Sequence, residues 1–363
     1  MNRLLKFFLL FILFIHIILL YANSQQGTAY RLINADHLQM NRISDEYITY
    51  LRGNVHFFYG DIEFKADRAE VYEKQKYVIM KGNVLAIQDT LSIKCNEAQY
   101  YHNNEFLRVQ GNVIMTETGS QGSYREVRAN TGEYKRLDGD IELKGNIKAY
   151  TQLDSLHAIA GFATYNLSTG YGYLSQKPVI WKAGNDSLSL SAEKIEFYND
   201  TQRIIASFNV VTENNDLKAT SNFLIYYGLE ERLVYIGNPK VYSKFGDGQA
   251  DLITVFLKEQ QIDKIDFNDN CLIYFSTEED EIKNNMVKSS RMQLFYQEGK
   301  PSKFYAEESV ETYFVQHSNQ KQLAMNNRVF SNKLQLSFDD EMQIQIIKLD
   351  AVTKGKYRFE RKK

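Results

Sequence analysis

The sequence predicts an all-β fold made of stacked antiparallel hairpins. Two short motifs alternate along the chain at a nearly fixed spacing, and apolar and polar residues alternate with a period of two between them. Clusters of polar turn residues separate these stretches. The composition agrees with strands, because 13% of the 363 residues are aromatic and only 3 are proline.

The first motif is a Gly-Asn-Val triplet. It occurs at residues 53–55, 82–84 and 111–113, so successive copies are 29 residues apart. Altered copies follow at residues 145–147, 177–179, 208–210 and 237–239. A constant period of this length is typical of proteins whose repeats stack on one another. Glycine favours positive φ angles and asparagine tolerates them, so each triplet predicts a corner in the backbone.

The second motif is a small residue, two mostly polar residues, and then two apolar positions separated by one residue. Its clear copies begin at Ala35, Ala66, Cys95, Ala129, Ala160, Ala192, Ala250, Ser289 and Ser331. A poorer copy begins at Ala219. Because no linker interrupts these copies, we expect one continuous β-repeat array over residues 25–340. Residues 341–363 are expected to form a C-terminal edge strand and a basic tail.

Each repeat must contain more than one strand. Apolar Ile62 and Phe64 alternate with Glu63 and Lys65, which places one row of side chains on each face of a half-buried strand. Strands usually have about 5 to 10 residues, so a 29-residue unit must fold back at least once. Stacking such units predicts two long facing sheets or a solenoid, with a continuous apolar strip inside.

The first residues have the features of a secretory signal peptide. Arg3 and Lys6 precede an apolar run over residues 7–21, and the small residues Ala22 and Ser24 precede a cleavage position at Gln25. We therefore expect residues 1–24 to direct export to the periplasm. The alternative is an uncleaved N-terminal anchor, since the apolar run is only slightly shorter than a membrane span.

The charge and the titratable residues argue against several classes of function. Lys plus Arg (43) nearly balance Asp plus Glu (45), so no strong field favours nucleic acid as a partner. The histidines are scattered without the spacing of metal ligands, and no nucleophile motif is present, so we expect no enzyme, metal or cofactor. Asp36, Asp67 and Asp251 recur beside the repeat alanine or its equivalent, which indicates a structural role.

The two cysteines, Cys95 and Cys271, would lie in a compartment that permits disulfides. Their separation in space does not follow from the sequence. Cys95 stands where other repeats have alanine or serine, which favours a small buried side chain over a disulfide.

The stretch LRGNVHFFYGDIEFKADRAEVYEKQKYVIMKGNV at residues 51–84 resembles the OstA-like (LptA) family of lipopolysaccharide-transport proteins. The match is clearest over residues 31–113, and weaker copies extend it to residue 338. The resemblance implies a twisted, V-shaped antiparallel β-jellyroll, or β-taco, whose lengthwise apolar groove holds the acyl chains of lipid A.

The resemblance also implies a location and partners. Such proteins act in the periplasm of Gram-negative bacteria during outer-membrane biogenesis. They associate head to tail and with OstA-like domains of inner- and outer-membrane transport proteins, and this association provides contact with the membranes. The chain has more units than a minimal bridge protein, which leaves open whether it is the bridge or an accessory or fused form.

The candidate lipid-binding residues are the apolar positions expected to point inward in the clearest repeats. They are Ile33, Val55, Phe57, Ile62, Phe64, Val84, Ala86, Leu91, Ile93, Val113 and Met115. A slip of one residue in strand register would exchange the two faces. Packing of these residues as a closed core is an equally good interpretation at each position.

Two other functions remain open at this point. A packed structural or adhesive β-solenoid would use the same repeats without a lipid path. A polysaccharide-acting enzyme would use aromatic side chains such as Tyr100, Tyr171 and Trp181 as sugar platforms.

Overall fold

The computed structural model describes residues 30–118, 124–152, 155–183, 188–215, 217–243, 246–259, 261–275, 285–317, 323–339, 341 and 344–361. The expected signal peptide lies outside these residues. Within them, no helix has both the length and the apolar character that a membrane crossing requires.

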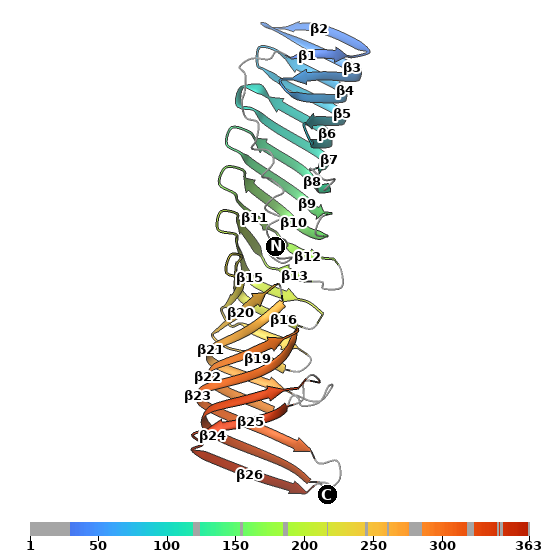
Figure 1. Cartoon of the computed structure of the whole chain (residues 1–363). Coiled ribbons are helices and arrows are strands. Elements are labelled where there is room, and N and C mark those ends of the chain that lie inside the picture. The colour runs from blue at the N-terminus through green and yellow to red at the C-terminus, as the bar shows by residue number, and fades with distance from the viewer. Residues whose placement is uncertain are drawn as a thin grey trace. The chain divides into compact units, whose positions relative to one another are not determined.

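The described residues form 26 β-strands and one short 3₁₀ helix, η2 (His102–Asn104) (Figure 1). Every strand pairing in the described residues is antiparallel, as the pairing of β3 with β4 illustrates, so the predicted all-β antiparallel fold is confirmed. The strands are β1 (Arg31–Asn34), β2 (His37–Ile43), β3 (Glu46–Tyr59), β4 (Ile62–Tyr72), β5 (Tyr77–Gln88), β6 (Leu91–Tyr101), β7 (Phe106–Thr118), β8 (Tyr124–Lys135), β9 (Asp140–Thr151), β10 (Leu156–Asn166), β11 (Tyr171–Ser175), β12 (Val179–Lys182), β13 (Ser189–Ser191), β14 (Lys194–Tyr198), β15 (Arg203–Glu213), β16 (Leu217–Tyr227), β17 (Arg232–Ile236), β18 (Lys240–Ser243), β19 (Gly246–Gln249), β20 (Leu252–Lys258), β21 (Gln261–Phe275), β22 (Asn285–Gln297), β23 (Lys300–His317), β24 (Leu323–Phe338), β25 (Ile344–Asp350) and β26 (Lys354–Arg361).

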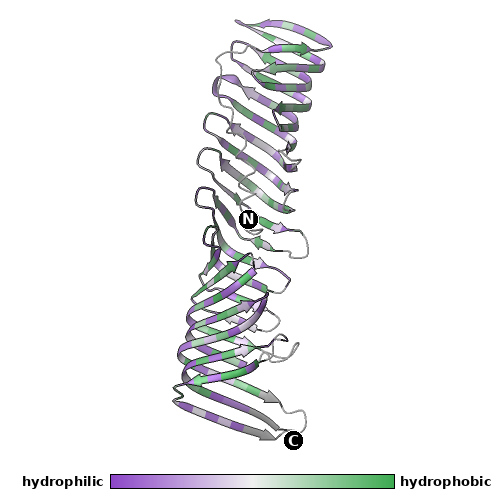
Figure 2. Ribbon diagram, viewed as in Figure 1, coloured by the Kyte–Doolittle hydropathy of each residue, from purple (hydrophilic) through white to green (hydrophobic). Residues whose placement is uncertain are grey.

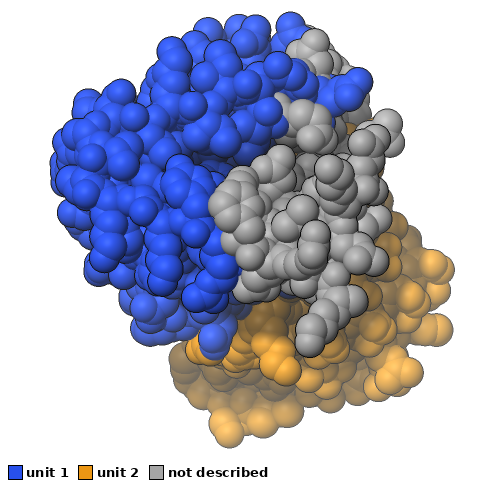
Figure 3. Space-filling view, turned by 90° about the horizontal axis from the view of Figure 1, so that it is seen from below, with its two compact units in different colours: residues 1–5, 186–192, 203–363 blue, residues 6–185, 193–202 orange. Residues whose placement is uncertain are grey.

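The chain divides into two compact units, which Figure 3 colours separately. The N-terminal unit is the described part of Lys6–Asn185 together with Glu193–Gln202, and it contains β1–β12 and β14. The C-terminal unit contains β13 and β15–β26.

The N-terminal unit is a meander in which each strand from β3 to β10 pairs with the next. At its start, β1 and β2 pair with different halves of β3. At its other end, β11 and β12 pair with different halves of β10, and β14 pairs with β11.

The C-terminal unit has a similar order. β13 pairs with β15 and β15 with β16, whose two halves pair with β17 and β18. β17 pairs with β20, and β18 pairs with β19. Both β19 and β20 then pair with β21. The strands β21–β24 then form a meander, and β25 and β26 pair with different halves of β24.

The Gly-Asn motif forms a repeated corner in the middle of the long strands. Gly82 and Asn83 have φ angles of 77° and 47°. The register of β5 shifts between Lys81 and Leu85 against β4 and between Lys81 and Val84 against β6. Extra residues of this kind bend a strand and leave the ladder locally unpaired. The prediction of a backbone corner at these triplets is therefore confirmed.

The second motif holds each corner in place. Asn54 donates hydrogen bonds from Nδ2 to the Asp36 carboxylate at 3.0 and 3.2 Å, and Asn83 donates to Asp67 Oδ2 at 2.9 Å. A Cβ atom at Gly82 would lie 2.3 Å from Asp67 Oδ2. Glycine is thus required both by its φ angle and by the acidic side chain packed against it. The recurring aspartates have the structural role that their positions indicated.

The corner persists where the glycine is absent. Positive φ angles occur in pairs at residues 176–177, 208–209, 269–270 and 308–309, none of which contains glycine. Asn270 still donates to Asp251 Oδ2 at 2.8 Å. The pairs at 269–270 and 308–309 are further corners that no Gly-Asn triplet marks, because only the conformation and the following apolar residue are retained there.

Two rows of apolar side chains form the core of the N-terminal unit. Residues directly opposite each other in these rows come from successive strands. The first inward row consists of Leu32, Phe57, Phe64, Ala86, Ile93, Met115, Val127, Ala149, Ala158 and Ile180. The second inward row consists of Leu51, Ala69, Met80, Ala98, Val109, Gly132, Leu143, Ala163, Leu174 and Ile195. Figure 2 shows the alternation of apolar and polar residues along these strands.

Candidate functional site: an apolar cavity in the N-terminal unit

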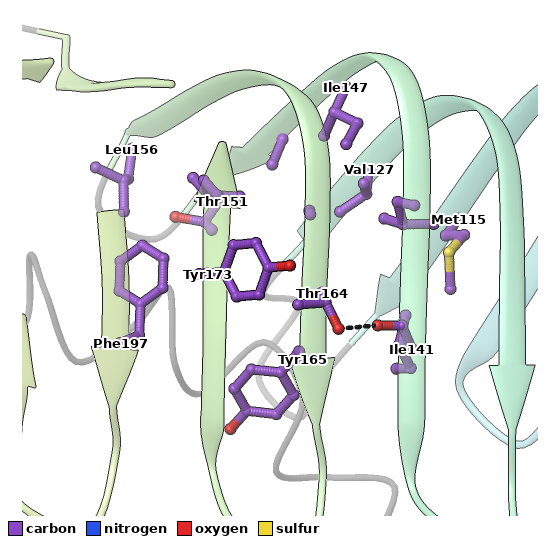
Figure 4. A pocket seen from close by; sticks show the side chains of 14 residues that line it. Met115, Val127, Ile141, Ile147, Thr151, Leu156, Thr164, Tyr165, Tyr173 and Phe197 are labelled. Atoms are coloured by element: carbon purple, nitrogen blue, oxygen red, sulfur yellow. Dashed lines mark hydrogen bonds between the residues drawn. The ribbon is translucent and has the colours of Figure 1, made fainter. Parts of the chain in front are cut away.

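A cavity of about 90 Å³ lies among strands β7–β11 and β14, within the N-terminal unit. Nearly all of its wall is apolar, and Figure 4 shows the side chains around it. The lining residues are Met115, Val127, Ile141, Leu143, Ile147, Ala149, Thr151, Leu156, Ala163, Thr164, Tyr165, Tyr173, Leu174 and Phe197.

Small side chains leave this space open. Ala149 and Ala158 are directly opposite each other in the first inward row. In the second inward row, Ala163 lies opposite Leu143, and both residues line the cavity. An interior filled by close packing leaves a void only where such side chains are too short to meet their neighbours.

The interior is closed nearer the start of the unit. Phe57 and Phe64 are opposite each other, stack with ring centroids 5.3 Å apart, and are both fully buried. Tyr100 packs on Phe64 at 5.7 Å. Large rings therefore occupy, between β3 and β6, the space that alanines leave open further along.

Most of the predicted lipid-binding residues lie in the inward rows or beside the corners. Buried positions are Val55, Phe57, Phe64, Val84, Ala86, Ile93 and Val113. Ile62, Leu91 and Met115 are half-buried, with Ile62 and Leu91 next to hairpin turns. Of the whole predicted set, Met115 is the residue that lines the cavity.

Ile33 does not occupy the inward position expected for it. It lies in a bulge of β1 between Leu32 and Asn34, and it is 49% exposed. Leu32 is the residue opposite Phe57. The reason is a one-residue shift at the first strand, where no earlier strand fixes the register.

Sequence reasoning missed most of the cavity because it concentrated on the clearest motif copies. Val127, Ile147 and Phe197 lie beyond the first repeats, from which the candidate residues up to Met115 were taken. The available indication was in the first inward row, where the small residues Ala149 and Ala158 follow the large rings of Phe57 and Phe64.

Polar groups lie at one end of the cavity, where the strands end. Glu117, Arg125 and Thr151 are successive neighbours across β7, β8 and β9, and all three are buried. Arg125 Nη1 lies 3.2 Å from Glu117 Oε2. A second threonine of the lining, Thr164, donates a hydrogen bond from its hydroxyl to the Ile141 carbonyl at 3.1 Å (Figure 4).

The aromatic residues suggested as sugar platforms have other contacts. Tyr100 is buried in the core. The Tyr171 hydroxyl donates to Glu196 Oε1 at 2.7 Å, and Trp181 stacks on His157 with centroids 5.1 Å apart. Among the described residues, no group of three or more His, Cys, Asp or Glu side chains is arranged to hold a metal ion.

Both cysteines are free and buried. Cys95 lies opposite Val84, beside a corner, and its thiol donates to the Glu97 carbonyl at 3.2 Å. The interpretation of Cys95 as a small buried side chain thus agrees with its position.

An early strand of the N-terminal unit and a late strand of the C-terminal unit expose apolar side chains. On β2, Leu38 and Met40 are each 53% exposed. On β25, in the other unit, Ile346 and Ile347 are 46% and 50% exposed. Exposed edge strands are templates for pairing with another sheet.

The segment that contains the cavity is similar to a known protein family. Residues 72–203 match the model of the family described as LptA/(LptD N-terminal domain) LPS transport protein, and all fourteen lining residues lie within that segment. No curated protein matches the chain. Among solved structures, LptH of Pseudomonas aeruginosa, the LptA-homologous periplasmic component of its lipopolysaccharide transport device, is 16% identical with a TM-score of 0.29, covering 32% of this chain and 82% of that one. The predicted resemblance is therefore confirmed: residues 72–203 match the family of LptA and the LptD N-terminal domain, whose model is described as an LPS transport protein.

Proposed function

We propose that this chain is a periplasmic lipopolysaccharide-binding protein that shields the acyl chains of lipid A while they pass between the inner and outer membranes. The observation that supports this most directly is the apolar cavity within the segment that matches the transport family. The inward rows continue this apolar surface along the unit in both directions.

The energetic demand on such a protein is large. Each CH₂ group exposed to water costs about 0.8 kcal/mol, so an acyl chain of roughly a dozen carbons costs on the order of 10 kcal/mol. A row of similar apolar side chains offsets this cost at each position and keeps neighbouring positions close in energy. Lipid can then move along the row when a partner supplies the driving force.

The difference between the closed interior near β3 and the open cavity further along suggests where lipid enters first. The alanines around the cavity leave space, whereas the stacked rings of Phe57 and Phe64 fill it. Lipid contact near β3 and β4 therefore requires the rings to move apart. We expect the segment from β7 to β14 to bind lipid more readily.

Photocrosslinking tests this function. A photoreactive residue at Met115 or Ile147, which line the cavity, should label lipopolysaccharide in cells, and Phe57 should label it more weakly. Ile114 is a matched control because it neighbours Met115 but pairs with Lys94 and Arg128 in the alternate row of the sheet. Absence of labelling from every inward position would favour the packed structural or adhesive solenoid instead.

The exposed edge strands support head-to-tail self-association and pairing with OstA-like domains of membrane partners. Light scattering over a concentration series should show a rise in mass, and Leu38→Lys should reduce it. A protein that stays monomeric at every concentration, alone and with partner domains, would exclude this part of the proposal.

A further inference from the structure

The inner face of the N-terminal unit contains a buried polar cluster next to the apolar cavity. The cluster consists of Glu117, Arg125 and Thr151, with exposed fractions of 6%, 6% and 2%. Glu117 is opposite Arg125, and Arg125 is opposite Thr151, so their Cβ atoms are about 4.5 to 5.5 Å apart across the strands. Thr151 also lines the cavity and is opposite Leu156, which lines it too.

The Thr151 hydroxyl has no hydrogen-bond partner in the described structure, although its oxygen is buried. A buried hydroxyl without a partner destabilises the folded protein, because it has lost its hydrogen bonds to water without replacement. Valine has nearly the same shape and would avoid this cost. The hydroxyl therefore points to a partner that the described residues do not supply.

The buried Arg125–Glu117 ion pair beside Thr151 is also not explained by its contribution to folding stability. Removing both charges of such a pair in favour of apolar side chains is often neutral or stabilising. The pair lies at the strand ends, in the same rows that are apolar further inside. Its position marks the boundary between the apolar interior and the rim.

We infer that Thr151, with the Arg125–Glu117 pair behind it, binds the hydrogen-bonding oxygen near one end of an acyl chain whose hydrocarbon lies in the cavity. This rests on the proposed function and adds to it a fixed position and direction for one chain. Because the guanidinium and the carboxylate neutralise each other, the cluster suits a neutral hydroxyl or ester oxygen better than a phosphate.

Binding of two matched small amphiphiles tests the inference. The full-length protein is loaded with N-phenyl-1-naphthylamine, a fluorescent apolar probe, which is then displaced by octan-1-ol or by 1-fluorooctane. The two competitors have the same hydrocarbon chain, but the fluorine cannot donate a hydrogen bond. Wild-type protein should bind octan-1-ol about fivefold more tightly than 1-fluorooctane, the range expected for one hydrogen bond.

Thr151→Val should abolish this preference and leave the binding of 1-fluorooctane within about twofold of wild type. Thr164→Val is the matched control, because Thr164 also lines the cavity but its hydroxyl is already bonded to Ile141. It should retain the preference. The double variant Arg125→Met with Glu117→Leu removes both charges together and should weaken the preference while keeping the fold.

The outcomes separate the two proposals. If both competitors displace the probe equally from wild-type protein, or if Thr151→Val keeps the preference, the polar cluster is not a binding site and the transport function is unaffected. If neither the probe nor the competitors bind to wild-type protein, the lipid-binding function itself is wrong.

Discussion

Replacing Gly82 by alanine tests the account of the repeated corner. Gly82 has a φ angle of 77°, which costs an L-residue about 1 to 2 kcal/mol. The new Cβ would lie 2.3 Å from Asp67 Oδ2, so the carboxylate must move and lose its 2.9 Å hydrogen bond from Asn83. That bond contributes about 0.5 to 1.5 kcal/mol, and the free energy of unfolding should fall by about 2 to 3 kcal/mol in total.

Urea unfolding followed by tryptophan fluorescence is a suitable assay. Trp181 is the single tryptophan of the chain and lies in the same unit as Gly82. The cost of Gly82→Ala should shrink to about 1 to 2 kcal/mol when it is measured in an Asp67→Ala background, since the clash is then absent.

Gly299→Ala provides a comparison, because Gly299 has a φ angle of 78° and no atom within 4 Å of the added Cβ. Gly299→Ala should lower the free energy of unfolding only by the cost of the positive φ angle. Unfolding in urea followed by far-ultraviolet circular dichroism measures this loss. A loss below about 0.5 kcal/mol for Gly82→Ala, or the same loss with and without Asp67, would show that the corner is not held by this contact.

Three further predictions concern thiols, pH and the cavity. Burial raises the pKa of Cys95 to about 11 and that of Cys271 to about 12, so iodoacetamide at pH 8 should label the folded protein at least about a hundredfold more slowly than the protein in urea; fast labelling of the folded protein would contradict this. A hydrogen bond from Arg128 lowers the pKa of Glu126, which contributes stability above its unfolded pKa and loses it as the pH falls through the lower folded value. The difference in unfolding free energy between wild type and Glu126→Gln should therefore shrink from pH 6 to pH 3, and a constant difference would refute the assignment. Ile147→Trp should fill the cavity, weaken binding of the naphthylamine probe at least about fivefold and cost about 1 to 3 kcal/mol of stability; unchanged binding would place the probe elsewhere.

Much of the fold followed from local pattern. The period-two alternation and the 29-residue spacing gave the antiparallel hairpins, and the Gly-Asn triplets gave the corners. These features are predictable because each depends on the backbone preferences of two or three residues. Corners at residues 269–270 and 308–309 were missed because asparagine, aspartate, glutamate and serine adopt the same positive φ angles there without glycine.

The site was harder to predict than the fold. Which inward positions line open space depends on the volumes of residues on neighbouring strands, and this requires the register of several strands at once. Phe57 matched the expected pattern but is closed core, whereas Ala149 and Ala158 leave space only because they face each other. Thr151 could not be recognised at all, because its missing partner is visible only when its surroundings are known.

The corner contacts also bear on how such a chain can change in length. Asp67 lies on β4 and the glycine it packs against lies on β5, and the same relation joins Asn130 on β8 to Gly145 on β9. Each corner is therefore completed by the strand just before it and requires nothing from more distant strands. A duplication or deletion of one whole hairpin preserves every such contact, whereas a change of a few residues within a hairpin breaks one. We expect natural variation in this architecture to occur in steps of about 29 residues.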